Sequence, residues 1–290
     1  MERASNNNRS NQLQDRIFEG LYGEQTKLNQ IEIQKYKSNP VEGYLAYVND
    51  FYKKDIPPQF REYPISLVKI MLFSYLKNYQ KNEEIPLLYA EILSKDIIDT
   101  PGTSVSNKYQ GMMDSYHAYK QSIETKNRLI IWELAKNAFL SYNEFLNGVL
   151  GLIIINLRVA NELNYKPGIL KNNYGVNRNQ YLEIIPEDIF FDLFSELLHP
   201  DLRNAIGHQT IWFDEKRLVV TYQANTDGEE KHLPLEEFIY LTSKASYLGE
   251  AYLVGLCAIG VMKSKNIMDK TRLPKELFLF LMEHAPPIIK

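Results

Sequence analysis

The chain has 290 residues, of which 44% are apolar, so it is long enough for one large domain or two modest ones with a proper core. Its formal net charge of −3 creates no general positive field, so contact with nucleic acid requires a local basic patch. Cys257 is the single cysteine, which excludes a disulfide within the chain and a cysteine-based zinc site. Residues 1–10 are polar and lack the apolar core of a signal peptide, so we expect a cytoplasmic protein.

The N-terminal part, residues 13–120, is predicted to be a helical region of unknown role. Residues 1–12 before it are rich in Asn and Ser and are expected to form a disordered tail. Pro64 is expected in the first turn of a helix whose apolar positions follow it. Helical spacing of apolar residues predicts further helices over residues 12–38, 41–52 and 86–93.

A domain boundary is expected between residues 104 and 126, after a turn-forming cluster of Pro, Gly, Thr and Ser. The helical domain that follows is predicted to cover residues 121–290. It opens with a long stretch of helical spacing over residues 127–163.

A basic segment follows over residues 164–180, which we interpret as a loop. Lys166, Lys171 and Arg178 lie in it, and no acidic residue occurs between Glu162 and Glu183. Such a loop suits contact with an RNA backbone. An ordinary solvated connection is the alternative.

The remaining pattern predicts helices and one β-hairpin. Acidic residues after Pro186 mark the start of a helix, and two alternating runs predict a hairpin at about residues 209–223. Pro234 is expected to open a long helix that ends near residue 262, and a last helix covers residues 274–283. Two apolar stretches, over residues 148–157 and 248–262, are shorter than the roughly 18 residues typical of a membrane span, so we expect buried helices and no membrane contact.

Residues 203–208, of sequence RNAIGH, are the strongest candidate site in the chain. On a straight helix Arg203 and His208 diverge by roughly 140°. Gly207 favours ending the helix in left-handed geometry, which would free His208 to turn toward Arg203. A second copy of the chain related by a twofold axis is another way to bring the two together.

RNA cleavage requires little more than these groups, because the ribose 2′-hydroxyl of the substrate is itself the nucleophile. His208 can transfer a proton near neutral pH. Arg203 carries a permanent planar charge that matches phosphate oxygens, and Asn204 can support either group. This chemistry calls for no metal and no cofactor.

The motif and its surroundings resemble the HEPN superfamily, helical domains whose ribonuclease members carry an Arg-polar-x3-His motif at a helix end. The flanking residues 201–202 and 210–214 are similar to those of bacterial members, and the resemblance covers about residues 125–265. It implies that Arg203 and His208 are catalytic, that Asn204 supports them and that a homodimer forms the site. It also implies RNA as substrate, a role in toxin or anti-phage systems, and an antitoxin or regulatory partner. Thr210 stands where antitoxin-paired members have a tyrosine, so regulation through that tyrosine is not implied.

Taken together, the sequence predicts a mostly α protein: a helical bundle of HEPN type with one inserted β-hairpin, preceded by a helical N-terminal region. The favoured function is metal-independent endoribonuclease. The alternative is a non-catalytic module that binds RNA or nucleotides, or interacts within a defence complex. A purely structural role is a third interpretation, in which Arg203 pairs with Glu196 or Asp201 and His208 ends a helix.

Overall fold

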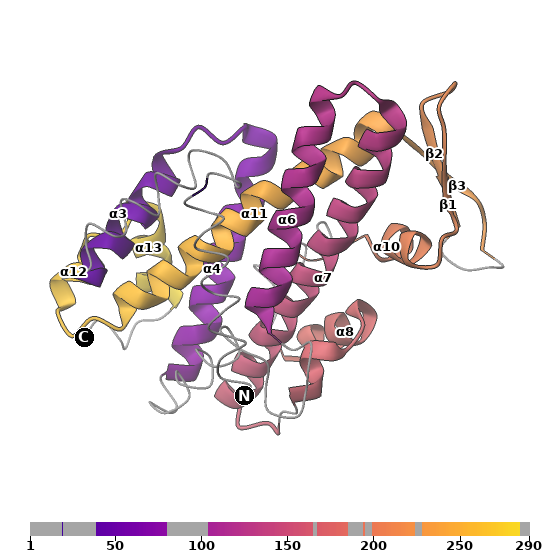
Figure 1. Cartoon of the computed structure of the whole chain (residues 1–290). Helices are drawn as coiled ribbons and strands as arrows, with labels where there is room; N and C mark the ends of the chain where they lie inside the picture. Colours follow the sequence, from indigo (N-terminus) through magenta and orange to yellow (C-terminus); the bar gives the residue numbers. More distant parts are fainter. Residues whose placement is uncertain are drawn as a thin grey trace, which may run out of the picture. The chain divides into compact units, whose positions relative to one another are not determined.

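The structure, a computed structural model, describes residues 19, 39–79, 104–164, 167–184, 194, 199–223 and 228–284. These residues are mostly helical and include one small antiparallel sheet, which confirms the predicted class (Figure 1). The elements are α3 (Pro40–Lys53), α4 (Pro58–Tyr79), α6 (Val105–Glu124), α7 (Arg128–Ala160), η1 (Pro167–Lys171), α8 (Tyr174–Ile184), α10 (Pro200–Gly207), β1 (Ile211–Asp214), β2 (Val219–Tyr222), β3 (Lys231–Pro234), α11 (Leu235–Met262), α12 (Ile267–Thr271) and α13 (Lys275–His284). The predicted tail over residues 1–12 and the predicted helices over 12–38, 86–93 and from Pro186 lie outside the described residues, apart from isolated positions.

The chain separates into two compact units, one of residues 1–86 with 250–290 and one of residues 87–249. The division expected between residues 120 and 121 does not coincide with these units, because it falls inside α6. Helices α6 and α7 form a hairpin, side by side in Figure 1.

Two residues, Lys126 and Asn127, shape the turn between α6 and α7. Lys126 adopts the left-handed conformation with φ 56°, which reverses the chain after α6. Asn127 then caps α7, because its side-chain oxygen accepts hydrogen bonds from the N–H groups of Leu129 and Ile130. These two residues therefore join α6 and α7 as a packed hairpin.

An aromatic cluster forms a core in the unit of residues 87–249, around the N-terminal part of α7. The ring centroid of Trp132 lies 5.6 Å from that of Phe213 on β1 and 5.0 Å from that of Phe238 on α11. Phe139, two turns further along α7, lies 5.4 Å from Phe238. Leu202 of α10 is buried in the same cluster. The sheet, α10 and the start of α11 are therefore anchored on one stretch of α7.

The sheet has three strands in the order β1-β2-β3, all antiparallel. The hairpin of β1 and β2 confirms the prediction for residues 209–223. Strand β3 was not predicted, because its four residues show no alternating pattern and Pro234 was assigned to the start of the next helix. Pro234 instead ends β3 at the edge of the sheet, where proline is tolerated, and α11 begins one residue later.

The segment interpreted as a basic loop, residues 164–180, is largely helical. It contains η1 and the first part of α8, and both pack on α7. Gly151 of α7 permits this approach, since a Cβ atom there would lie 3.3 Å from the carbonyl oxygen of Ile169. Lys108 of α6 also holds η1 by donating a hydrogen bond to the carbonyl of Leu170, at 3.1 Å. Tertiary contacts that the local composition does not indicate therefore order this segment.

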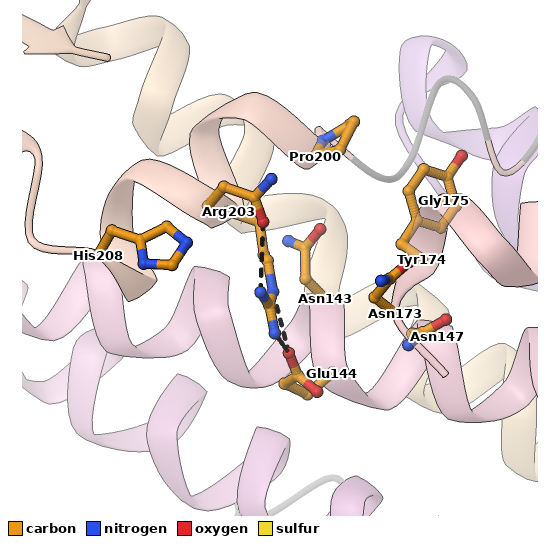
Figure 2. A pocket seen from close by; sticks show the side chains of 10 residues that line it. Asn143, Glu144, Asn147, Asn173, Tyr174, Gly175, Pro200, Arg203 and His208 are labelled. Carbon is orange, nitrogen blue, oxygen red and sulfur yellow. Dashed lines mark hydrogen bonds and ion pairs between the residues drawn. The ribbon is translucent and has the colours of Figure 1, made fainter. Parts of the chain in front are cut away.

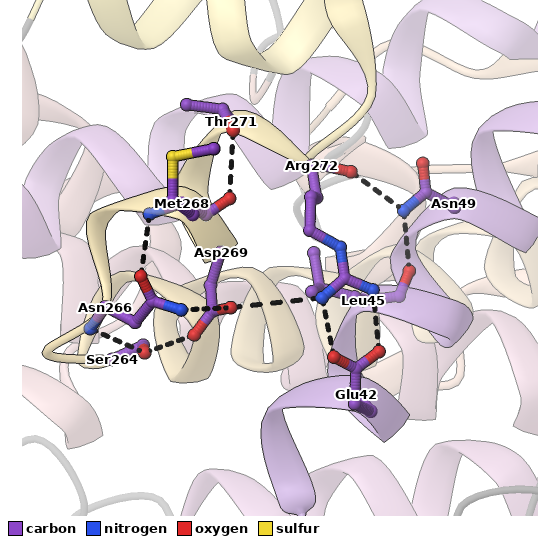
Figure 3. A network of polar contacts seen from close by, with 9 residues as sticks. All are labelled: Glu42, Leu45, Asn49, Ser264, Asn266, Met268, Asp269, Thr271 and Arg272. Atoms are coloured by element: carbon purple, nitrogen blue, oxygen red, sulfur yellow. Dashed lines mark hydrogen bonds and ion pairs between the residues drawn. The ribbon is translucent and has the colours of Figure 1, made fainter.

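The unit of residues 1–86 with 250–290 joins the two ends of the chain. In Figure 3, Arg272 after α12 makes two hydrogen bonds to the carboxylate of Glu42 on α3, at 2.5 and 2.7 Å. Its carbonyl also accepts a hydrogen bond from Asn49 of α3, at 3.2 Å. The guanidinium beside Glu42 lowers the pKa of that carboxyl. Residues 230 positions apart in the sequence thus meet in one unit.

Pro64 lies inside α4 and not in its first turn, so that prediction was wrong. The helix begins at Pro58, and the N–H of Phe60 already donates to the carbonyl of Pro57 at 2.8 Å. Pro58 occupies the first turn that suits proline. The helix therefore continues through Pro64, although proline has no backbone N–H to donate to the preceding turn.

Among the described residues, α7 and α11 are long and apolar enough to span a membrane by length and composition. The apolar stretches expected over residues 148–157 and 248–262 are parts of helices of 33 and 28 residues. Within their most apolar windows, 83% of α7 and 69% of α11 is buried inside the structure, as in the core helices of other proteins.

Candidate functional site

Helix α10 displays the predicted motif because its two faces differ in polarity. Pro200 occupies the first turn, where proline needs no backbone donor. Leu202 and Ala205 are buried, and Leu202 belongs to the same core cluster as Trp132 and Phe139 of α7, whereas Arg203 and Asn204 between them are half-buried. These two buried apolar side chains therefore fix the orientation of α10.

The helix ends just after the motif, but Gly207 does not take the left-handed conformation predicted for it. Gly207 is the last helical residue, and the left-handed residue is Gln209, with φ 60°. The N–H of Thr210 donates to the carbonyl of Ala205 at 2.8 Å, and that of Gln209 donates to Ile206 at 3.2 Å. These two bonds form a Schellman motif, which satisfies the last carbonyls of the helix.

A pocket of about 430 Å³ lies beside α10 and brings together residues from three helices. It is lined by Asn143, Glu144 and Asn147 of α7, Asn173, Tyr174 and Gly175 at the start of α8, and Pro200, Arg203, Asn204 and His208 in and after α10. Figure 2 shows Arg203 and Glu144 in the middle, His208 on one side, and Asn143, Asn173 and Tyr174 on the other. Arg203, Asn204 and His208 thus line one pocket within one chain, although a straight helix directs Arg203 and His208 apart.

Arg203 is held across the pocket by Glu144. Its Nε and Nη2 atoms donate hydrogen bonds to Glu144 Oε1, the first at 3.0 Å. Its Nη1 atom donates to Oδ1 of Asn204 at 3.3 Å. The structural interpretation had named other partners for Arg203, but Asp201 pairs with Lys231, and Glu196 lies outside the described residues. Arg203 therefore faces the pocket from α10 while its charge is balanced from α7.

His208 is exposed at the C-cap of α10 and forms one wall of the pocket. Its backbone N–H donates to the carbonyl of Asn204 at 2.8 Å. Within the described part of the chain, its imidazole makes no hydrogen bond or ion pair. The ring is thus available to a molecule in the pocket.

Those predicted RNA-contact residues that the structure describes do not line this pocket. Lys166 lies outside the described residues. Lys171 is exposed at the end of η1, and Arg178 is half-buried on α8. Neither is among the residues that line the pocket. A role for these residues in binding RNA stays a prediction.

Sequence reasoning missed Glu144 and the carboxamides of the pocket. One signal was present in α7, where Asn143, Glu144 and Asn147 interrupt an otherwise apolar stretch at positions that share a helix face. Asn173 shows another signal, because asparagine before a helix is a favoured N-cap, and its Oδ1 accepts the N–H of Val176 at 3.0 Å. Neither signal indicates that the polar residues of α7 and the start of α8 line the same pocket.

Comparisons of the chain with protein-family models, with curated proteins and with solved structures find no match. The resemblance to the HEPN superfamily stays a prediction that rests on residues 203–208 and their surroundings.

Proposed function

We propose that the protein is an endoribonuclease that cleaves RNA through attack of a ribose 2′-hydroxyl on the neighbouring phosphate. The observation that supports this most is that Arg203, Asn204 and His208 line one polar pocket. A permanent cation and a group that can transfer a proton are the two elements that this reaction needs.

The proposed reaction uses His208 for proton transfer and Arg203 for charge. The imidazole takes the proton of the 2′-hydroxyl as its oxygen attacks phosphorus, and Arg203 stabilises the charge that grows on the phosphate oxygens. The bond from phosphorus to the 5′-oxygen breaks, and that oxygen takes a proton from the imidazolium or from water. The products are a 2′,3′-cyclic phosphate and a 5′-hydroxyl end.

Glu144 and Asn204 are positioning residues in this proposal. Both accept hydrogen bonds from the Arg203 guanidinium, which limits its rotation. Preorganised donors lower the barrier because they need no rearrangement as charge develops.

Non-catalytic binding of RNA or nucleotides is the second candidate function. It is favoured by one observation: no group among the described residues makes a hydrogen bond that orients the His208 ring, whereas general bases are commonly oriented by a third group. In that case the same pocket holds a phosphate at Arg203 without cleaving RNA.

The resemblance to HEPN ribonucleases extends the proposal to a role in a toxin or anti-phage system, with an antitoxin or regulatory partner. Induced expression of the full chain in a bacterial host tests this role. Growth should stop with the wild-type chain and continue with a His208→Ala variant.

Cleavage of a single-stranded RNA of mixed sequence by the purified chain, with a chelator present, tests the activity. His208→Ala and Arg203→Ala should each lower the rate at least about a hundredfold, the scale of a lost proton-transfer group or charge stabiliser. His232→Ala and Arg217→Ala are matched controls, since both side chains are exposed on the sheet and its turn, away from the pocket lining. They should leave the rate unchanged.

RNA that binds the wild-type chain but is never cut would select the binding function. Equal cleavage by the two pocket variants and the two controls would contradict both candidates for this site.

Mixing the two inactive variants tests the predicted homodimeric site. If Arg203 of one chain works with His208 of another, a mixture of Arg203→Ala and His208→Ala chains regains part of the activity. Because both residues line one pocket in the chain described here, we expect no recovery. Recovery to about a quarter of the wild-type rate would establish a site shared between two chains.

A further inference from the structure

The pocket beside α10 has a second end that the proposed reaction does not use. In Figure 2, Asn143, Asn173 and Tyr174 lie on the side of Arg203 that is away from His208. The volume of about 430 Å³ falls within the range of sites that hold small molecules. A phosphate at Arg203 leaves this second end for the rest of a nucleotide.

The charges of the pocket limit what the second end can hold. Among the described residues that line it, Arg203 is the cation and Glu144 the anion, and the two pair with each other. Away from His208, the lining beyond this pair carries no charge and consists of asparagine carboxamides with Tyr174, Gly175 and Pro200. It therefore suits an uncharged polar group better than a second phosphate, which would require a further cation.

The carboxamides at this end have hydrogen-bonding atoms in reserve. Asn143 uses one Nδ2 hydrogen on the carbonyl of Phe139, at 2.9 Å, which leaves its other hydrogen and, within the described chain, its Oδ1 atom. Asn173 uses Oδ1 to cap α8, and its Nδ2 group makes no hydrogen bond to the described residues. A donor next to an acceptor, as in Asn143, matches the edge of adenine, which offers an amino donor beside a ring nitrogen.

Tyr174 adds a flat apolar surface to this end. Its hydroxyl donates a hydrogen bond to the carbonyl of Phe194 at 3.0 Å, which fixes the ring. Tyrosine rings in RNA-binding proteins stack on unpaired bases. A ring held in place beside free carboxamides combines the two ways in which proteins hold a single base.

We infer that Asn143, Asn173 and Tyr174 form a nucleobase subsite that holds an adenine whose 3′-phosphate lies at Arg203. This inference rests on the proposed function for the source of the base, which is the RNA nucleotide on the 5′ side of the cleaved bond.

Calorimetric binding of nucleoside 3′-monophosphates to the full chain tests the subsite without any need for cleavage. Adenosine 3′-monophosphate should bind at least tenfold more tightly than ribose 5-phosphate, which lacks a base, and more tightly than the guanosine, cytidine and uridine compounds. Asn173→Asp keeps the N-cap but replaces the amide donor with an acceptor. This variant should lose most of the tenfold gain in affinity of adenosine 3′-monophosphate over ribose 5-phosphate.

Asn179→Asp is the matched control, since it makes the same change at an exposed position of α8 that does not line the pocket. It should leave the gain intact. At the ring, Tyr174→Phe should keep most of the gain and Tyr174→Leu should lose about tenfold in affinity. Two independent pairs keep the test decisive if one variant fails to fold.

Cleavage positions in an RNA of mixed sequence test the source of the base. The wild-type chain should cut on the 3′ side of adenosine, and Asn173→Asp should lose this preference. Cutting without preference by a chain that binds adenosine 3′-monophosphate would overturn the assignment of the base to the substrate.

The experiments distinguish a failure of the nucleobase subsite from a failure of the proposed ribonuclease function. Equal binding of all four nucleotides and ribose 5-phosphate overturns the subsite even if RNA is cut in a His208-dependent manner. Base-dependent binding that is lost in Asn173→Asp, in a chain that never cuts RNA, supports the subsite and contradicts the ribonuclease. Tighter binding of another nucleotide than the adenosine compound overturns the adenine assignment.

Discussion

At the scale of single residues, the pairing of Arg203 with Glu144 shapes the electrostatics of the pocket. The two side chains remain 37% and 40% exposed, so solvent screens their attraction and the pair adds little to stability. Its main effect is on charge, because the carboxylate offsets a guanidinium that would otherwise face a phosphate alone.

Glu144→Gln should therefore separate stability from binding. The variant keeps a hydrogen-bond acceptor but removes the negative charge, so the free energy of unfolding should fall by no more than about 1 kcal/mol. Affinity for adenosine 3′-monophosphate should rise severalfold, since the charge of Arg203 is no longer offset. Denaturant unfolding and calorimetry measure the two effects. Weaker binding at unchanged stability would contradict the expected effect of charge and leave only the role of Glu144 in orienting Arg203.

Cys257 allows a test of burial through its protonation. Desolvation raises the pKa of its thiol from 9.0 to about 12. Because the thiolate is the reactive form, alkylation at pH 8 should be about a thousandfold slower than for the unfolded chain. Above about pH 9 the unfolded chain loses this proton before the folded one, so the contribution of Cys257 to stability declines as pH rises. Rates of iodoacetamide labelling at pH 8 with and without urea measure the difference in reactivity between the folded and the unfolded chain. Equal rates would contradict the expected protection of the thiol.

At the scale of elements, the end of α10 depends on one residue in an unfavourable conformation. Gln209 holds a left-handed conformation that glycine adopts more readily. Gly207 lies in the helix, and a Cβ atom there would meet nothing within 4 Å. Glycine therefore occupies the helical position 207, where alanine is more stable, and glutamine occupies the left-handed position 209, where glycine is more stable.

Placing alanine at position 207 or glycine at position 209 should stabilise the protein without moving the pocket. Gly207→Ala should raise the free energy of unfolding by about 0.5–1 kcal/mol, through a less flexible unfolded chain. Gln209→Gly should raise it by up to about 1 kcal/mol through relief of strain, whereas Gln209→Ala should give no gain. Denaturant unfolding measures all three. Loss of stability in Gly207→Ala would mean that Gly207 needs a conformation that alanine cannot adopt.

At the scale of the whole molecule, the two compact units divide the chain differently from the predicted domains. One unit combines the N-terminal helices α3 and α4 with residues 250–290. The other contains the whole of α6, whose buried Met112 and Tyr119 belong to its interior. A cut at residue 120 therefore damages both units.

Fragments of the chain distinguish the two divisions. A fragment of residues 121–290 lacks α3, α4 and most of α6, so its remaining helices expose apolar surface and should not unfold cooperatively. A fragment of residues 87–249 keeps one unit together and should show a cooperative thermal transition. Circular dichroism during heating measures both. A cooperative transition of the fragment 121–290 alone would restore the predicted domain boundary.

The sequence by itself determined the local features of the protein. The helical spacing over residues 127–163 predicted α7, and the alternating runs over 209–223 predicted the β-hairpin, because the spacing of buried residues follows the geometry of a single helix or strand. The motif of residues 203–208 was also visible, because its residues are contiguous in the sequence. These features include three members of the pocket: Arg203, Asn204 and His208.

Only the tertiary structure decided what surrounds them. Glu144 lies 59 positions before Arg203, and Glu42 lies 230 positions before Arg272, so no local pattern announces either pairing. The basic segment of residues 164–180 is ordered by packing on α7, which places Asn173 and Tyr174 in the pocket. Periodicity records which face of an element is buried, but the residues that face one another across a pocket depend on how separate elements pack.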